Sequence, residues 1–128
     1  MAFSGQWVRE ATAIVGEDGI LVDSEAMAPY SGDEFALPDI RRPPLAVAKP
    51  RTEEEASRIV ALCARMRVPV TVRGGGTGLS GGCVPSDGAI VLSLERLNRV
   101  VECDPATVFE LSDDGVMRRR LGSWRMWD

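Results

Sequence analysis

The residues best suited to chemistry form a cluster of glycines with two hydroxyls and one arginine among them. In order they are Arg73, Gly74, Gly75, Gly76, Thr77, Gly78, Leu79, Ser80, Gly81 and Gly82. Glycine is favoured where the backbone needs a positive φ or where main-chain N–H groups must approach a ligand closely. Successive N–H groups can form a nest that binds an anion, and hydroxyls add further hydrogen bonds. The sequence therefore predicts an anion-binding loop.

A flexible glycine-rich linker is the alternative interpretation of this cluster. Two features argue against it. Thr77, Leu79 and Ser80 interrupt the glycines, and β-branched or apolar runs at 70–73 and 89–94 flank the cluster on both sides. Linkers seldom lie so tightly between strands.

The elements before the cluster are expected to place it at the end of a parallel strand. Residues 45–48 form a short apolar run that predicts a buried strand. Thr52 and Glu55 form a capping box that starts a helix of about four turns, and residues 70–73 are the next strand. The apolar face of this helix is predicted to contain Ala56, Ile59, Val60, Cys63 and Met66. Strand, helix and strand form a βαβ unit with parallel strands, and open α/β sheets bind ligands at the carboxyl ends of such strands.

The N-terminal part predicts two helices. The first covers residues 4–15, with Trp7, Ala11, Ile14 and Val15 on one face. The second begins with Ser24 as its N-cap and ends at Pro29. Tyr30 and Asp33, which follow, are interpreted as turn residues, with a place beside a ligand site as the alternative.

Two known phosphate-binding loops can be compared with the glycine cluster, and neither accounts for it. The P-loop of nucleotide triphosphatases requires Lys and then Ser or Thr after the last glycine, but Cys83 follows Gly82. The Rossmann pattern G-x-G-x-x-G matches at Gly76, Gly78 and Gly81 but must open a helix. Here residues 82–88 are turn-rich and lead into a strand, so the nest must act without a helix dipole.

Composition limits the remaining functions. The 128 residues suit one domain, and a net charge of −4 argues against nucleic acid as a partner. No apolar run spans a membrane and no signal peptide is recognised, so a cytoplasmic location is expected. The chain has no histidine and three cysteines without a CxxC pair, so neither a metal site nor a histidine-dependent nucleophile is predicted. The cysteines are Cys63, Cys83 and Cys103.

Three stretches, residues 50–55, 73–82 and 90–99, together resemble the start of a flavoprotein domain. They are similar to the FAD-binding domain, of the vanillyl-alcohol oxidase or p-cresol methylhydroxylase (PCMH) type, in glycolate oxidase and D-lactate dehydrogenase flavoproteins. The resemblance implies an α/β (α+β) fold, an incomplete βαβ subdomain, in which residues 41–104 are the first part of the FAD-binding domain. It also implies that the main chain from Gly74 to Gly82 binds the FAD pyrophosphate, with hydroxyl contacts from Thr77 and Ser80.

The resemblance carries expectations about activity as well. Some relatives attach the flavin through a histidine at the position of Thr77, so FAD is expected to be non-covalent here. Full-length relatives oxidise 2-hydroxy acids by hydride transfer to the flavin, with catalytic residues in a later domain that nothing in this chain matches. Other subunits of an oxidase complex are possible partners.

The ends of the chain are expected to differ from this domain. Residues 1–40 are predicted to be a helical lead-in, and residues 105–128 an atypical tail such as truncation or a frameshift would leave, with an amphipathic segment around Trp124 and Trp127 as the alternative. Two hypotheses follow: an inactive FAD-binding fragment of a hydroxy-acid oxidoreductase, or a non-enzymatic module that docks a partner through an open sheet edge or its tryptophan tail.

Overall fold

The computed structural model describes residues 5–34, 40–104, 109–112 and 117–119. These residues fall into two compact units, one up to Arg96 and one from Leu97 onward. No helix in the described ranges has the length and apolar character that a membrane crossing requires.

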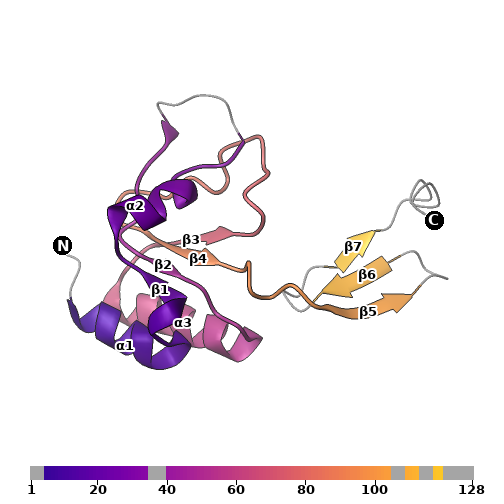
Figure 1. The fold of residues 1–128 in the computed structure, drawn as a ribbon, viewed down its shortest axis with the longest axis horizontal. Helices are drawn as coiled ribbons and strands as arrows, with labels where there is room; N and C mark the ends of the chain where they lie inside the picture. Colours follow the sequence, from indigo (N-terminus) through magenta and orange to yellow (C-terminus); the bar gives the residue numbers. More distant parts are fainter. Residues whose placement is uncertain (1–4, 35–39, 105–108, 113–116, 120–128) are drawn as a thin grey trace. The chain divides into compact units, whose positions relative to one another are not determined.

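The first unit contains a four-stranded sheet in the order β1-β2-β4-β3 (Figure 1). The strands are β1 (Ile20–Leu21), β2 (Val47–Ala48), β3 (Val70–Arg73) and β4 (Ile90–Ser93). Both β2 and β3 pair with β4 in parallel, whereas β1 pairs with β2 in antiparallel fashion. The predicted parallel arrangement is confirmed, although β4 lies between the two strands of the βαβ unit.

Helices α1 (Gly5–Val15) and α3 (Glu53–Met66) cover one face of this sheet (Figure 1). The α3 cap forms as predicted, because the Thr52 hydroxyl accepts a hydrogen bond from the Glu55 amide at 3.1 Å. The Glu55 carboxylate accepts in turn from the amide of Arg51 at 2.7 Å, one residue earlier than a capping box has it.

The main core lies between these helices and the sheet. Its buried members are Trp7, Ala11, Val15, Ala46, Ala48, Ile59, Leu62, Cys63, Ile90 and Leu92. The predicted apolar face of α3 is wrong at one position. Val60 was expected on this face but is 46% exposed, and Leu62 is buried instead. Helix α1 packs beside α3 and thereby turns the buried stripe of α3 toward Leu62.

The opposite face of the sheet carries a smaller apolar cluster. Here α2 (Ser24–Met27) and the short 3-10 helix η2 (Ala28–Tyr30) bring Met27 against Val47 and Val91. The predicted N-cap is wrong by one residue, because Asp23, rather than Ser24, accepts the hydrogen bond from the Ala26 amide at 2.9 Å. A second short 3-10 helix, η1 (Glu17–Gly19), connects α1 to β1.

The second unit contains a three-stranded antiparallel sheet, β5-β6-β7. Its strands are β5 (Val100–Asp104), β6 (Phe109–Ser112) and β7 (Met117–Arg119), with a register irregularity between Val100 and Glu102. The expected tail therefore contains two strands within its described part. Trp124 and Trp127 lie outside the described residues, so the alternative that involves them stays a prediction.

Candidate functional site

The glycine loop, residues 73–82, leaves the sheet at the carboxyl end of β3, as predicted. Residues 74, 75 and 77–80 are exposed, so a ligand can approach their main chain from solvent. Gly76 and Gly81 have φ of 71° and 78°, values that side-chain-bearing residues rarely adopt. Residues 82–89 contain turns and no helix, and β4 follows. This arrangement excludes the Rossmann interpretation, whereas the predicted nest without a helix dipole stays a prediction.

Arg73 folds back under the loop rather than extending from it. Its Nη1 donates to the Gly32 carbonyl oxygen at 2.5 Å, and its guanidinium carbon lies 5.4 Å from the centre of the Tyr30 ring. A Cβ added to Gly76, which is buried, would collide with this guanidinium. The arginine therefore supports the turn at Gly76, whereas a direct contact between Arg73 and a cofactor stays a prediction.

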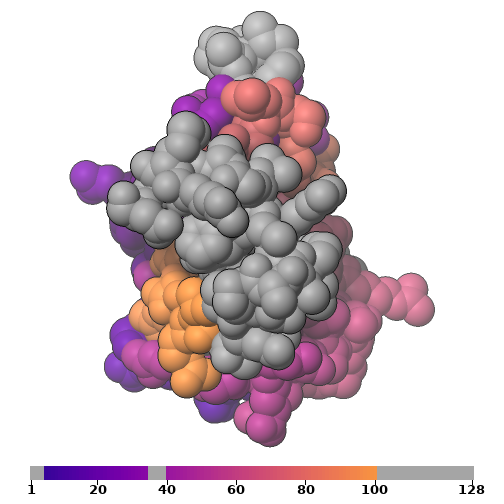
Figure 2. Space-filling model, turned by 90° about the vertical axis from the view of Figure 1, so that its right-hand side faces the viewer, coloured from indigo at the N-terminus to yellow at the C-terminus, as the bar shows by residue number. Residues whose placement is uncertain are grey.

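Asp33 supports the other half of the loop. Its Oδ2 accepts a hydrogen bond from the Gly81 amide at 2.9 Å, although the residue is only 7% exposed. The next amide, that of Glu34, donates to the Gly78 carbonyl at 3.1 Å. At the top of Figure 2 the loop region, in salmon, lies at the surface beside the purple atoms of the segment that ends at residue 34.

Tyr30 links this region to the end of β4. Its hydroxyl donates to the Glu95 carboxylate, with oxygen separations of 3.0 and 3.1 Å, and Glu95 forms an ion pair with Lys49 at 3.5 Å. Burial, followed by the Glu95 carboxylate, raises the pKa of Tyr30 above its usual value of 10.0. The interpretation of Tyr30 and Asp33 as turn residues is therefore incomplete, because Tyr30 lies against Arg73 and Asp33 is bonded to Gly81. The alternative, that they lie beside a ligand site, stays a prediction.

The strand register adds a residue that the sequence did not indicate. Ser93 pairs with Arg73, so both side chains lie on the α2 face of the sheet. The Ser93 hydroxyl is completely buried and has no hydrogen-bond partner among the described residues. In the sequence, Ser93 is a polar residue at the end of an apolar run. This pattern is common at strand ends and does not by itself indicate that a residue belongs to a functional site.

The loop meets two requirements of a diphosphate site. A Cβ at Gly74 or Gly82 would meet nothing within 4 Å, so the main chain there is open to close approach. The Asp33 carboxylate, which lies beside Gly78 and Gly81, is buried and accepts a hydrogen bond from the Gly81 amide, so it does not stand at the exposed side of residues 74 and 75. These residues therefore fit an anionic group.

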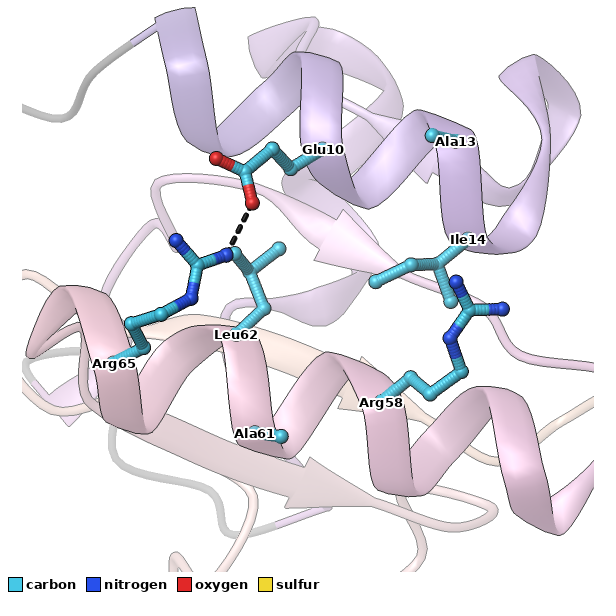
Figure 3. Close-up of a pocket in the computed structure, with 7 residues that line it drawn as sticks. All are labelled: Glu10, Ala13, Ile14, Arg58, Ala61, Leu62 and Arg65. Atoms are coloured by element: carbon cyan, nitrogen blue, oxygen red, sulfur yellow. Dashed lines mark hydrogen bonds and ion pairs between the residues drawn. The ribbon is translucent and has the colours of Figure 1, made fainter.

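A separate groove lies on the outer side of the two helices, away from the loop (Figure 3). Figure 3 shows Glu10 and Ile14 of α1 facing Arg58, Leu62 and Arg65 of α3, with Ala13 and Ala61 beside them. Glu10 and Arg65 form an ion pair that joins the helices. The groove is a shallow surface feature of helix packing and contributes no residue to the loop.

The ion pair in this groove predicts a pH dependence of stability. The hydrogen bond from Arg65, followed by that from Gln6, lowers the pKa of Glu10 below its usual value of 4.5. Because the pKa of Glu10 is lower in the folded state, its ionised carboxylate stabilises the fold above pH 4.5. This stabilisation is lost as the pH falls through the pKa of Glu10 in the folded protein. We expect Glu10→Gln to give a small decrease in Tm at pH 7 that diminishes as the pH is lowered below 4.5. Thermal scans from pH 7 into the acid range, with exposed Glu17→Gln as control, test it; a decrease that is as large in acid as at pH 7 contradicts it.

Comparison with known proteins identifies the class to which this fold and loop belong. A family model described as "FAD binding domain" matches residues 44–115, more than half of the chain. The chain therefore belongs to this family of FAD-binding domains, and the predicted PCMH-type fold class is confirmed. The match extends beyond residue 104, so the predicted boundary there stays a prediction.

Individual relatives agree with this assignment. The glycolate oxidase subunit GlcD of Bacillus subtilis is 39% identical over 88 residues, which are 69% of this chain and 18% of that protein. The D-lactate dehydrogenase of Archaeoglobus fulgidus is 41% identical over 83 residues, 59% of this chain and 19% of that protein. The chain thus spans about a fifth of the length of these curated relatives.

Solved structures show the same fold. The 4-ethylphenol oxidase of Gulosibacter chungangensis superposes with a TM-score of 0.73 at 25% identity, covering 90% of this chain and 23% of that one. A p-cresol methylhydroxylase structure gives 0.72 at 24% identity, covering 87% and 22%. The second similarity, at its lower identity, shows the fold alone.

Proposed function

We propose that residues 73–82 bind the diphosphate of FAD through main-chain N–H groups, with the hydroxyls of Thr77 and Ser80 as additional donors. The observation that carries this proposal is the exposed glycine loop at the carboxyl end of β3, within the residues that the FAD-binding domain family matches. Positive φ at Gly76 and Gly81 supports it, because alternating backbone conformations turn successive amides toward one side.

The bound FAD is non-covalent in this proposal. Thr77 occupies the loop position where some flavoproteins of this type use a histidine to attach the flavin, and a threonine hydroxyl does not form that bond. Each charge-assisted hydrogen bond from the loop contributes about 1.5–3 kcal/mol, whereas association costs about 4–15 kcal/mol. The loop by itself is therefore expected to bind FAD weakly.

The reaction that this site serves is the oxidation of a 2-hydroxy acid, such as glycolate or D-lactate, in the cytoplasm. FAD supplies the hydride acceptor in such a reaction, and this chain's part is to hold the diphosphate. The names of the glycolate oxidase and D-lactate dehydrogenase relatives support this substrate class. We further propose that the chain alone does not oxidise the acid, because it aligns with about a fifth of either relative. Other oxidase subunits are its proposed partners.

Titration of the purified chain with FAD, followed by flavin fluorescence, tests the proposal. We expect saturable binding that ADP, which carries a diphosphate, reverses and that riboflavin, which has no phosphate, leaves unchanged. Gly74→Ala should weaken binding about tenfold without lowering Tm, because its Cβ enters open space where the diphosphate must approach.

The matched control is Ser57→Ala on the exposed surface of α3, which should bind FAD like the wild type. An unchanged fluorescence signal up to millimolar FAD would contradict the proposed function. Competition by riboflavin but not by ADP would show that the flavin ring, rather than the diphosphate, is recognised.

A further inference from the structure

A short segment of chain far from the loop in sequence holds the loop's second half. Two hydrogen bonds of opposite direction join them: the Gly81 amide donates to Asp33 Oδ2 at 2.9 Å, and the Glu34 amide donates to the Gly78 carbonyl at 3.1 Å. The donor and acceptor in each pair are more than 40 residues apart. The contact is therefore tertiary and does not follow from the loop's own sequence.

We infer that Asp33 is a positioning residue that fixes the main chain of residues 78–81 and so presents the exposed amides of the loop to an anionic ligand. A glycine-rich segment loses much conformational entropy when it becomes ordered. A contact that orders it in the free protein removes this cost from the binding step. The identity of the ligand as FAD rests on the proposed function, whereas the ordering of the loop does not.

The residue type and its surroundings fit this role. Burial of a carboxylate at 7% exposure is costly unless donors are in place to meet it. The Gly81 amide is such a donor, and a hydrogen bond to an ionised acceptor is stronger than one between neutral groups. A Cβ at Gly78 would lie 3.3 Å from the same Oδ2, so glycine at this position gives the carboxylate room.

Arg73 supports the first half of the loop in a matching way. Its guanidinium is bonded to the Gly32 carbonyl, the residue immediately before Asp33. Residues 32–34 therefore contact the loop at its base, through Arg73, and at its end, through Gly78 and Gly81. Both halves of the loop are therefore hydrogen-bonded to one short segment.

Amide hydrogen exchange in the ¹⁵N-labelled full chain, with FAD titration alongside, tests the inference. In Asp33→Ala we expect the Gly81 amide to exchange at least about tenfold faster, because the substitution removes one charge-assisted hydrogen bond. The Val91 amide, which donates to Ala46 in the sheet, should change less than about twofold, and the FAD Kd should rise about tenfold. Asp33→Asn retains an acceptor oxygen and should keep Gly81 protection and the FAD Kd within about threefold of wild type.

The control is Glu25→Gln on the exposed part of α2, which removes one negative charge without touching the loop. Unchanged Gly81 exchange in Asp33→Ala would overturn the inference. If that variant fails to fold, Asp33→Asn decides: Gly81 protection kept together with an FAD Kd raised about tenfold or more would overturn the inference, because the loop would be held as before while binding was lost. Absence of FAD binding by the wild type would refute the proposed function, but the exchange measurement would still decide the role of Asp33.

Discussion

Replacing Gly76 with alanine is expected to abolish measurable FAD binding and to lower the free energy of unfolding of the first unit by about 2–4 kcal/mol. Gly76 has φ of 71°, where an L-residue is strained. The added Cβ would also collide with the Arg73 guanidinium. The guanidinium can move away only by leaving the Gly32 carbonyl and the Tyr30 ring, so the substitution removes support from the whole loop.

Two further variants make this expectation specific. Gly82→Ala, where a Cβ meets nothing within 4 Å and φ is not positive, should stay within about 0.5 kcal/mol of wild type in stability. In an Arg73→Ala background, Gly76→Ala should cost less than in the wild type, because the collision is gone. Urea unfolding curves and flavin titrations measure these effects. Equal losses for Gly76→Ala and Gly82→Ala would contradict the explanation.

Trp7→Ala should cause the largest loss of stability, about 3–5 kcal/mol. Trp7 belongs to α1, and its indole is completely buried in the main core. The indole Nε1 donates to the sulfur of Cys63, on α3, at 3.3 Å. Burial raises the pKa of the Cys63 thiol, so this sulfur stays a neutral partner at pH 7. Truncation to alanine leaves a large cavity in the main core, and urea unfolding followed by circular dichroism measures the loss.

The comparison variant for this prediction is Val22→Ala, since Val22 is 54% exposed. It should change stability by less than about 0.5 kcal/mol. Trp7→Phe keeps most of the volume and should fall between the two. A loss below about 1 kcal/mol in Trp7→Ala would show that the helix layer does not depend on this side chain.

Local patterns in the sequence were sufficient for the features that depend on neighbouring residues. The capping interaction of Thr52 and Glu55 joins residues three apart, and the strand at 70–73 follows from a short β-branched run. The glycine loop and its place after a parallel strand follow from the same local information. These parts of the fold and of the candidate site were therefore predictable.

The contacts that shape the loop were not predictable in this way. Asp33 and Gly81 are 48 residues apart, and Gly32 and Arg73 are 41 apart, so no periodicity or motif connects them. Their meeting depends on which strands become neighbours, a property of the whole sheet. Likewise, helical spacing locates an apolar stripe on α3, but only the docking of α1 decides that Leu62 rather than Val60 is covered.

The central position of β4 has a consequence for the order in which the chain folds. As the chain is synthesised from its N-terminus, β2, α3 and β3 appear before β4, yet within the described residues each flanking strand has its parallel hydrogen bonds only with β4. Until residue 93 is available, these two strands have no parallel partner and the helices have no complete sheet to cover. A nascent chain that stops within the glycine loop is therefore expected to stay unfolded, and assembly of the sheet is what closes the loop.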